Sequence, residues 1–337
     1  MIDIKLISKN NLKLLIDTIL NMRKIVIAPK RKSNRLYFSR VQAFADIELD
    51  FVQTALSAKS VVFPRNEELF NYIFDGKNVI IKNTEPLKQE VIIFGIKPCD
   101  ASSFDYMKEF FLNENPDVHF KTHFENTTII SFACKEADDF CFCTSVGGSP
   151  TNTKGSDIML TQINENTYYA EILTEKGKAI YDLAPNLFDI NDELDKKRYT
   201  AEVPVKFDCS KLTNKLENVF EHPLWLKNSL SCLGCGTCAY ACPTCTCFDI
   251  QDESNIYGGS RVRIWDTCAL GLFTQHASGH NPRSIQSQRW RQRIKHKFEY
   301  SKENLGYISC VGCGRCIRLC PGRLNIVDNI ISLVEEN

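Results

Sequence analysis

The sequence has none of the usual signatures of a nucleotide-binding or hydrolytic site. It contains no GxGxxG run after an expected strand, no Walker loop, no HExxH motif and no nucleophile elbow. The chain therefore offers no recognisable place to accept or deliver a hydride. Long apolar runs are also missing, and no stretch reaches the length of a membrane span.

An excess of charge of either sign is absent as well. The 337 residues include 41 Lys and Arg and 41 Asp and Glu, so the formal net charge is zero. Nothing global steers such a chain to nucleic acid or to an anionic membrane. Because the first residues show neither an apolar signal stretch nor a twin arginine, we expect a cytoplasmic protein.

Cysteine, in contrast, is abundant and unevenly distributed. Sixteen cysteines without a secretion signal favour metal sites in a reducing cytosol over a disulfide framework. Residues 1–208 hold four of them and residues 209–337 hold twelve, and a charged stretch, 189–206, lies between the two groups. We therefore expect two domains, 1–208 and 209–337, with 189–206 as the connector.

The most informative feature of the sequence is a cysteine spacing that occurs twice. The two copies are Cys232-x2-Cys235-x2-Cys238-x3-Cys242-Pro243 and Cys310-x2-Cys313-x2-Cys316-x3-Cys320-Pro321. This is the spacing of bacterial ferredoxins with two clusters, in which the first three cysteines of a run bind one 4Fe-4S cube and the fourth binds the other. The pattern predicts one cluster on Cys232, Cys235, Cys238 and Cys320, and a second on Cys310, Cys313, Cys316 and Cys242.

Two other interpretations of these runs fit less well. Zinc sites usually show two CxxC pairs rather than a run of three cysteines plus one. The spacing Cys238-x3-Cys242-x2-Cys245 matches enzymes that cleave S-adenosylmethionine by radical chemistry, but Cys238 and Cys242 already belong to the longer repeat. We predict a ferredoxin-like domain with two 4Fe-4S clusters and a long helical insert at 243–309.

The N-terminal domain has the pattern of an α/β fold, so the fold class expected for the whole chain is α+β. Helical spacing covers 11–22 and 101–112; strands are expected at 24–29, 61–64, 79–81, 91–96 and 127–133, with a hairpin at 157–161 and 168–173. The runs 91–96 and 127–133 are almost continuously apolar, which is typical of strands buried on both faces.

Four cysteines follow these two buried strands. Cys99 comes after the first strand, and Cys134, Cys141 and Cys143 come after the second. If the two strands are neighbours, their carboxyl ends meet at one edge of the sheet, where sites form in open α/β folds. The four thiols would then complete a third iron–sulfur cluster. The alternative is that all four are buried free thiols, which behave as small hydrophobic side chains.

Three further cysteines lie outside both runs and outside the N-terminal set. They are Cys245, Cys247 and Cys268. With His276 or His280 as a fourth ligand they could bind another cluster or metal, or they could form a redox-active or substrate-facing site. The alternative is that they shield the second cluster and that Cys268 packs against Trp265. Cys209 stands alone, and we expect it to be inert.

A basic stretch at 283–297 surrounds Trp290, and the neutral overall charge makes nucleic acid a poor partner for it. It predicts either a solvated helix face or a docking surface for an acidic partner chain. Clusters move single electrons, whereas NAD(P)H gives a pair, and a flavin is the usual converter. We therefore expect FAD and NAD(P)H on a partner chain.

The cysteine motifs and several short segments resemble a known family. The segments are His222–Trp225, Cys242–Cys247, Trp265–Cys268, Gly279–Arg283 and Cys310–Pro321, with Phe94–Asp100, Cys141–Ser145 and Gly155–Ile158 in the N-terminal half. Together they resemble the iron–sulfur subunits of two related complexes. One is the beta subunit of sulfhydrogenase-type nickel–iron hydrogenases, and the other is the corresponding iron–sulfur subunit of anaerobic sulfite reductase. The N-terminal motifs are closer to the hydrogenase type.

The resemblance implies an electron-transfer subunit of a soluble, anaerobic oxidoreductase complex, with no catalytic site of its own. Single electrons would pass between a flavoprotein subunit that oxidises NAD(P)H or ferredoxin and a catalytic subunit, either a hydrogenase or a sulfite or sulfur reductase. It also implies that Cys245, Cys247 and Cys268 belong to the family pattern, and it supports the four N-terminal cysteines as one set. Two alternatives stay open: a stand-alone reductase of sulfur compounds that uses the Cys245, Cys247 and Cys268 centre, and a zinc or nucleic-acid binding module.

Overall fold

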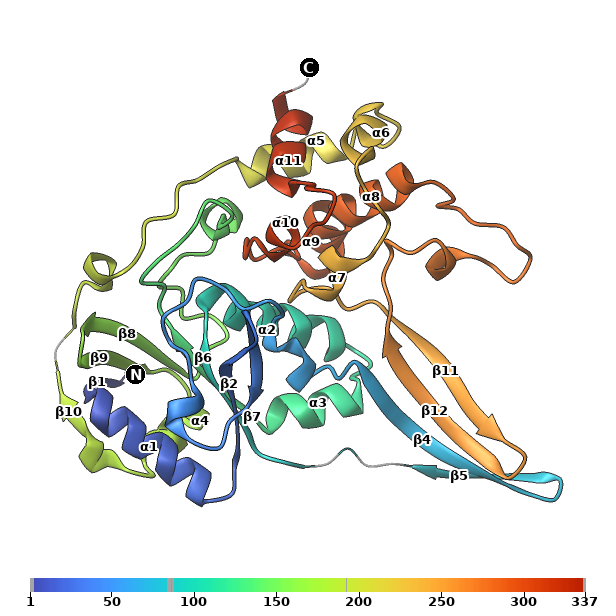
Figure 1. Cartoon of the computed structure of the whole chain (residues 1–337). Coiled ribbons are helices and arrows are strands. Elements are labelled where there is room, and N and C mark those ends of the chain that lie inside the picture. Colours follow the sequence, from blue (N-terminus) through green and yellow to red (C-terminus); the bar gives the residue numbers. More distant parts are fainter. Residues whose placement is uncertain (1–2, 84–85, 87, 192, 336–337) are drawn as a thin grey trace.

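A mixed sheet, a smaller protruding sheet and a helical part with both cysteine runs make up the molecule (Figure 1). The computed structural model describes residues 3–83, 86, 88–191 and 193–335. The described N-terminal end lies in the larger sheet, and the described C-terminal end lies at the far end of the helical part (Figure 1). Within these residues no helix is long and apolar enough to cross a membrane.

The larger sheet carries the N-terminal cysteines. Among the described residues it has eight strands in the order β10, β1, β9, β8, β7, β6, β2, β3. Their bounds are β1 (Asp3–Ser8), β2 (Ile25–Lys32), β3 (Arg35–Arg40), β6 (Val91–Ile96), β7 (Thr127–Phe132), β8 (Ile158–Asn164), β9 (Thr167–Ile172) and β10 (Phe188–Ile190). The pairs β2–β6, β6–β7 and β7–β8 are parallel. The expected buried strands are thus confirmed, and they are neighbours.

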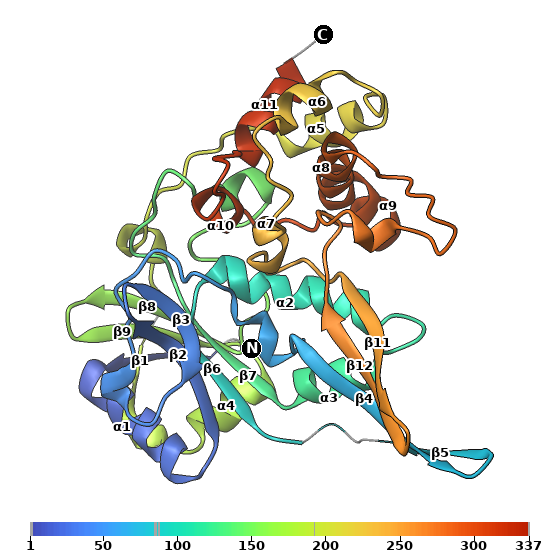
Figure 2. The same cartoon turned by 45° about the vertical axis from the view of Figure 1, so that its right-hand side comes forward.

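Four helices accompany this sheet, and one of them leads to the cysteine sites. They are α1 (Lys9–Asn21), α2 (Pro98–Phe111), α3 (Val118–Glu125) and α4 (Glu175–Tyr181). Helix α2 begins at the carboxyl end of β6 with Pro98 in its first turn, where the missing N–H of proline costs nothing. It lies between the larger sheet and the cysteine-rich helices (Figure 2). Cys99 in its first turn lines a cavity together with Cys310 of the second half of the chain.

The smaller sheet combines strands from both sides of residue 208. Its described order is β11 (Phe248–Asn255), β12 (Gly258–Trp265), β4 (Asn66–Asp75) and β5 (Asn78–Asn83). The segment 243–309 therefore differs from the expected helical insert, because its first half is a hairpin. The β12 strand pairs with β4 along its length. Such a distant partner leaves no trace in the local sequence pattern.

One short apolar run differs from the expected strand. Val61 is the last residue of a 3-10 turn, Ala58–Val61, and residues 62–64 after it form no strand. Val62 and Phe63 are fully buried, and the Phe63 ring stacks on Trp265 with centroids 5.7 Å apart. A buried loop and a buried strand give the same short apolar signal, which explains the error.

The remaining helices enclose the two cysteine runs. They are α5 (Cys209–Leu216), α6 (Leu224–Ser229), α7 (Thr237–Tyr240), α8 (Gln286–Lys295), α9 (Ser301–Leu305), α10 (Arg315–Arg318) and α11 (Ile326–Glu335), with a π-helical turn, His296–Tyr300, between α8 and α9. Trp225, Trp290 and Ile330 are buried in their shared core. The expected connector 189–206 contributes to β10 and donates from the Ala201 N–H to the Cys134 carbonyl at 2.8 Å.

Candidate metal centres

The two cysteine runs fold into the same backbone shape. In each run a glycine with positive φ precedes the second cysteine, Gly234 (φ 65°) and Gly312 (φ 63°). A second such glycine, Gly236 or Gly314, caps the one-turn helix that carries the third cysteine. This left-handed region is open to glycine at little cost. The repeated spacing therefore produces two equivalent turns that present three thiols each.

The first expected ligand set gathers around one cavity. The cysteines that line it are Cys232, Cys235, Cys238, Cys316 and Cys320. Four of these are the predicted set, drawn from both runs, and Cys316 belongs to the neighbouring set. Gln286 Nε2 donates to Cys232 Sγ at 3.0 Å, and the Leu324 N–H donates to Cys320 Sγ at 3.3 Å. The crossed arrangement of a two-cluster ferredoxin is thus present in the geometry.

The second expected set is more deeply enclosed. The thiols that lie within electrostatic reach of Cys316 are those of Cys313, Cys242 and Cys310. Burial raises the pKa of Cys310 to about 12, so its unbound thiol would be neutral. Because a metal deprotonates a coordinating thiol outright, such buried thiols suit metal binding better than nucleophilic chemistry.

The N-terminal set also comes together. Cys99 lies within electrostatic reach of Cys134, and Cys143 lies within reach of both Cys134 and Cys141. Burial raises the pKa of Cys134 to about 11, although the nearby Lys97 ammonium acts in the opposite direction. These four cysteines therefore lie in one region beyond the ends of β6 and β7, and their role as ligands of one cluster stays a prediction.

This N-terminal set packs directly against the second cysteine run. The Phe142 N–H donates to the Gly312 carbonyl at 3.0 Å. A Cβ at Gly312 would lie 2.4 Å from the Cys143 nitrogen, and one at Gly314 would lie 2.5 Å from the Phe140 carbonyl oxygen. These contacts leave no room for a side chain at either glycine, so the glycines serve the packing as well as the turn.

We expect Gly312→Ala to destabilise the protein more than Gly306→Ala. Both glycines have positive φ, and a Cβ at Gly306 meets nothing within 4 Å. Backbone strain alone costs about 1–2 kcal/mol, whereas overpacking at Gly312 adds about 1–3 kcal/mol. Denaturant unfolding of both variants measures the difference. Equal free energies of unfolding would show that Cys143 does not pack on Gly312.

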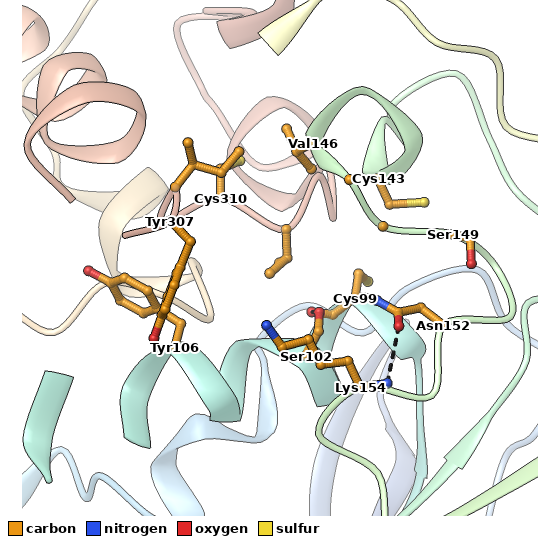
Figure 3. Close-up of a pocket in the computed structure, with 14 residues that line it drawn as sticks. Cys99, Ser102, Tyr106, Cys143, Val146, Ser149, Asn152, Lys154, Tyr307 and Cys310 are labelled. Atoms are coloured by element: carbon orange, nitrogen blue, oxygen red, sulfur yellow. Dashed lines mark hydrogen bonds between the residues drawn. The ribbon is translucent and has the colours of Figure 1, made fainter. Parts of the chain in front are cut away.

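Beside these direct contacts, a cavity of about 130 Å³ lies between part of the N-terminal set and part of the second run (Figure 3). Cys99 and Cys143 lie on one side of it and Cys310 on another (Figure 3). Tyr106 and Tyr307 also line the cavity, with ring centroids 5.8 Å apart. The two cysteine sets therefore face a common space.

The three unassigned cysteines form a chain of neighbours between the two runs. The thiol of Cys245 hydrogen-bonds to that of Cys242, and Cys247 hydrogen-bonds to Cys268. The hydrogen bond with Cys247 lowers the pKa of Cys268 to about 6. Cys268 is only 8% exposed.

Neither histidine considered as a fourth ligand accompanies these cysteines. His276 and His280 lie in an exposed loop, where their ring centroids are 5.4 Å apart. Across the described ranges, no group of three or more His, Cys, Asp or Glu side chains is arranged for a single metal ion. In a 4Fe-4S cube each thiolate binds a different iron, so cube ligands stand further apart than those of one ion.

Three buried cations lie close to Cys242 and Cys245. Arg293 donates to Cys245 Sγ at 3.3 Å, Lys297 donates to Cys242 Sγ at 3.2 Å, and Lys59 donates to the Cys245 carbonyl at 2.8 Å. Burial lowers the pKa of Lys59 to about 8. Burial also lowers the pKa of His296 to about 4, and the neighbouring positive charges of Lys297 and Arg293 add to this shift.

The end of the basic stretch, 293–297, thus differs from both sequence expectations, whereas Arg283, Arg289 and Arg291 are partly exposed. Arg293, Lys295 and Lys297 are buried, so this part of the chain is neither a solvated face nor an open docking surface. Lys295 pairs with Glu299 on the side away from the cysteines, and its ammonium donates to the Leu216 carbonyl at 2.7 Å. Sequence reasoning missed Lys59, because nothing near it in the chain indicates a metal site.

The residues present fit iron–sulfur clusters. Each ferredoxin-type set offers four converging thiols from two runs. The buried positive charges of Arg293 and Lys297 face cysteine sulfur, and a buried cation without an anion is strongly destabilising. An anionic metal–sulfur centre supplies the missing negative charge.

Comparisons with known proteins agree with this geometry. Residues 231–324 match the family model described as a 4Fe-4S dicluster domain. Sulfhydrogenase 2 subunit beta of Pyrococcus furiosus is 27% identical over 310 residues, which cover 90% of each chain. No solved structure matches. The chain is therefore similar to a sulfhydrogenase beta subunit and matches a 4Fe-4S dicluster domain over residues 231–324, as the sequence resemblance indicated.

Proposed function

We propose that this chain is an electron-transfer subunit of a hydrogenase-type oxidoreductase complex. A 4Fe-4S cluster, when bound, accepts and releases one electron at a time. The observation that carries the proposal is the crossed arrangement, with cysteines of both runs around one cavity and Cys242 beside the second run. The related Pyrococcus furiosus protein is a subunit of a sulfhydrogenase, which supports a partner complex for this chain too.

The protein's own residues hold and shield the centres. We assign Cys232, Cys235, Cys238 and Cys320 to one cluster, and Cys242, Cys310, Cys313 and Cys316 to the other. Trp290 and Leu324 keep water from the cavity of the first set. Cys235, which is exposed, brings this set to the surface. An electron carrier on another chain can therefore approach the first set directly.

We assign a third cluster to Cys99, Cys134, Cys141 and Cys143. Its support is their convergence beyond β6 and β7, together with their packing on Gly312 and Gly314. This packing gives the three sets a linear order, in which the second set lies between the exposed first set and the N-terminal set. The assignment of Cys245, Cys247 and Cys268 as metal ligands also remains a proposal, and the depth of Cys268 argues against an open sulfur-reducing centre.

An anaerobic pull-down of the full chain from its own host tests the proposal. We expect it to bring down the large subunit of a nickel–iron hydrogenase together with a flavoprotein. A sirohaem protein in place of the hydrogenase would show that the chain belongs to a sulfite reductase complex instead. A chain that comes down alone and still reduces polysulfide would overturn the relay in favour of a stand-alone reductase.

A further inference from the structure

Three cationic side chains are buried at the junction of the two cysteine runs. Lys59, Arg293 and Lys297 are 2%, 3% and 4% exposed. They come from the 3-10 turn at Ala58–Val61, from α8 and from the π-helical turn. Arg293 and Lys297 are four residues apart, which places them on the same side of a helix.

These cations have no carboxylate partner in the part of the chain that the structure describes. Other buried cations do: Arg315 pairs with Asp100, Arg263 with Glu67, and Lys295 with Glu299. The contacts of the three cations are instead backbone carbonyls, a threonine hydroxyl, the Trp265 ring and cysteine sulfur. Arg293 Nε has no hydrogen-bond partner among the described residues.

The charges of Lys297 and Arg293 act on more thiols of the second ligand set than of the other sets. Lys297 Nζ contacts Cys242 Sγ, and its charge also acts on Cys310. Arg293 donates to the Cys238 carbonyl at 2.8 Å and lies within electrostatic reach of the thiol of Cys238, in the first set, and of the thiols of Cys242 and Cys316, in the second. Three of the four thiols assigned to the second cluster are therefore close to a fixed positive charge.

We propose that Arg293, Lys297 and Lys59 raise the reduction potential of the cluster assigned to Cys242, Cys310, Cys313 and Cys316. The inference rests on the proposed function. A 4Fe-4S cube with four thiolates carries about two negative charges when oxidised and about three when reduced, and its potential depends on nearby charge and hydrogen bonds. A fixed positive charge at low dielectric favours the more negative, reduced form.

An EPR-monitored redox titration of the iron-loaded full chain tests this proposal. We expect Arg293→Gln and Lys297→Gln each to lower the reduced-to-oxidised ratio of this cluster about tenfold at fixed ambient potential, a shift of about 59 mV to more negative values. The signal is assigned as the one lost in Cys310→Ala. We expect Lys59→Met to shift the potential of the same signal in the same direction.

Arg291→Gln is the matched control, since it removes the same charge from the same helix. Its guanidinium lies over the Phe220 ring, 3.7 Å from the centroid, and donates to the Phe220 carbonyl rather than to cysteine. We expect it to keep the wild-type potential. If Arg293→Gln or Lys297→Gln fails to load iron, Lys59→Met decides. Unchanged potentials in every iron-loaded variant would overturn the inference and leave the proposed function standing, whereas a chain without clusters would overturn both.

Discussion

We expect Cys242→Ala to remove the cluster that is assigned mainly to the second cysteine run, although Cys242 lies in the first run. The Cys316 thiol lies within electrostatic reach of Cys242, Cys310 and Cys313, which predicts that these four share one cube. Because a cube with three thiolates is poorly held, we expect the loss of about four irons per chain. Iron analysis and the EPR spectrum of the reduced protein measure the loss.

The identity of the lost cluster provides the sharper comparison. Cys242→Ala and Cys310→Ala should leave the same residual spectrum, and Cys232→Ala should leave a different one. Cys209→Ala is the control, since Cys209 opens α5 and belongs to neither run, and it should keep all of the iron. If Cys242→Ala matches Cys232→Ala instead, the ligand sets are not crossed.

Asp100→Asn is expected to destabilise the protein by about 3–5 kcal/mol. Asp100 and Arg315 form an ion pair in which each side chain is 1% exposed. The pair joins the first turn of α2, next to Cys99, to the helix turn that carries Cys316. Removal of the carboxylate charge leaves a guanidinium buried without an anion. Arg315 then keeps its bonds to Gln53 and Thr54 and can still donate to the amide oxygen at position 100, but it loses the compensating charge.

Asp252→Asn is the matched control for this prediction. Asp252 pairs with Arg261 at 2.7 Å, with 45% and 41% of the two side chains exposed. Such exposed pairs contribute about 0–1 kcal/mol. Denaturant unfolding under anaerobic conditions compares the two variants, with iron content checked in each. An Asp100→Asn protein as stable as Asp252→Asn would show that the ion pair does not fasten the N-terminal set to the second run.

The sequence predicted the elements whose signal is local. The apolar runs of β6 and β7 are long enough to identify buried parallel strands, and their adjacency brings Cys99 and Cys134 together as expected. The hairpin of β11 and β12 was missed because it is stabilised by β4, which is far away in the chain. Pairing between distant strands has no periodic signature in either partner.

The cationic group illustrates a second limit of local patterns. A run of Arg and Lys ordinarily indicates a solvated surface, since charge is rarely buried without a partner. Arg293, Lys295 and Lys297 are all buried although they lie on both sides of the helical segment, so their spacing alone carried no signal of burial. Lys59 could not be found in this way, because only the tertiary fold brings it to Cys245.

We propose above all that this chain carries iron–sulfur clusters and transfers electrons through them. Iron and acid-labile sulfide per chain, measured after anaerobic purification together with reversible reduction followed by EPR, test it most directly. We expect about twelve irons and about twelve sulfides per chain, from three cubes with four of each, and every EPR signal should be reversible. An iron-free protein, or one that contains zinc in place of iron, would contradict it.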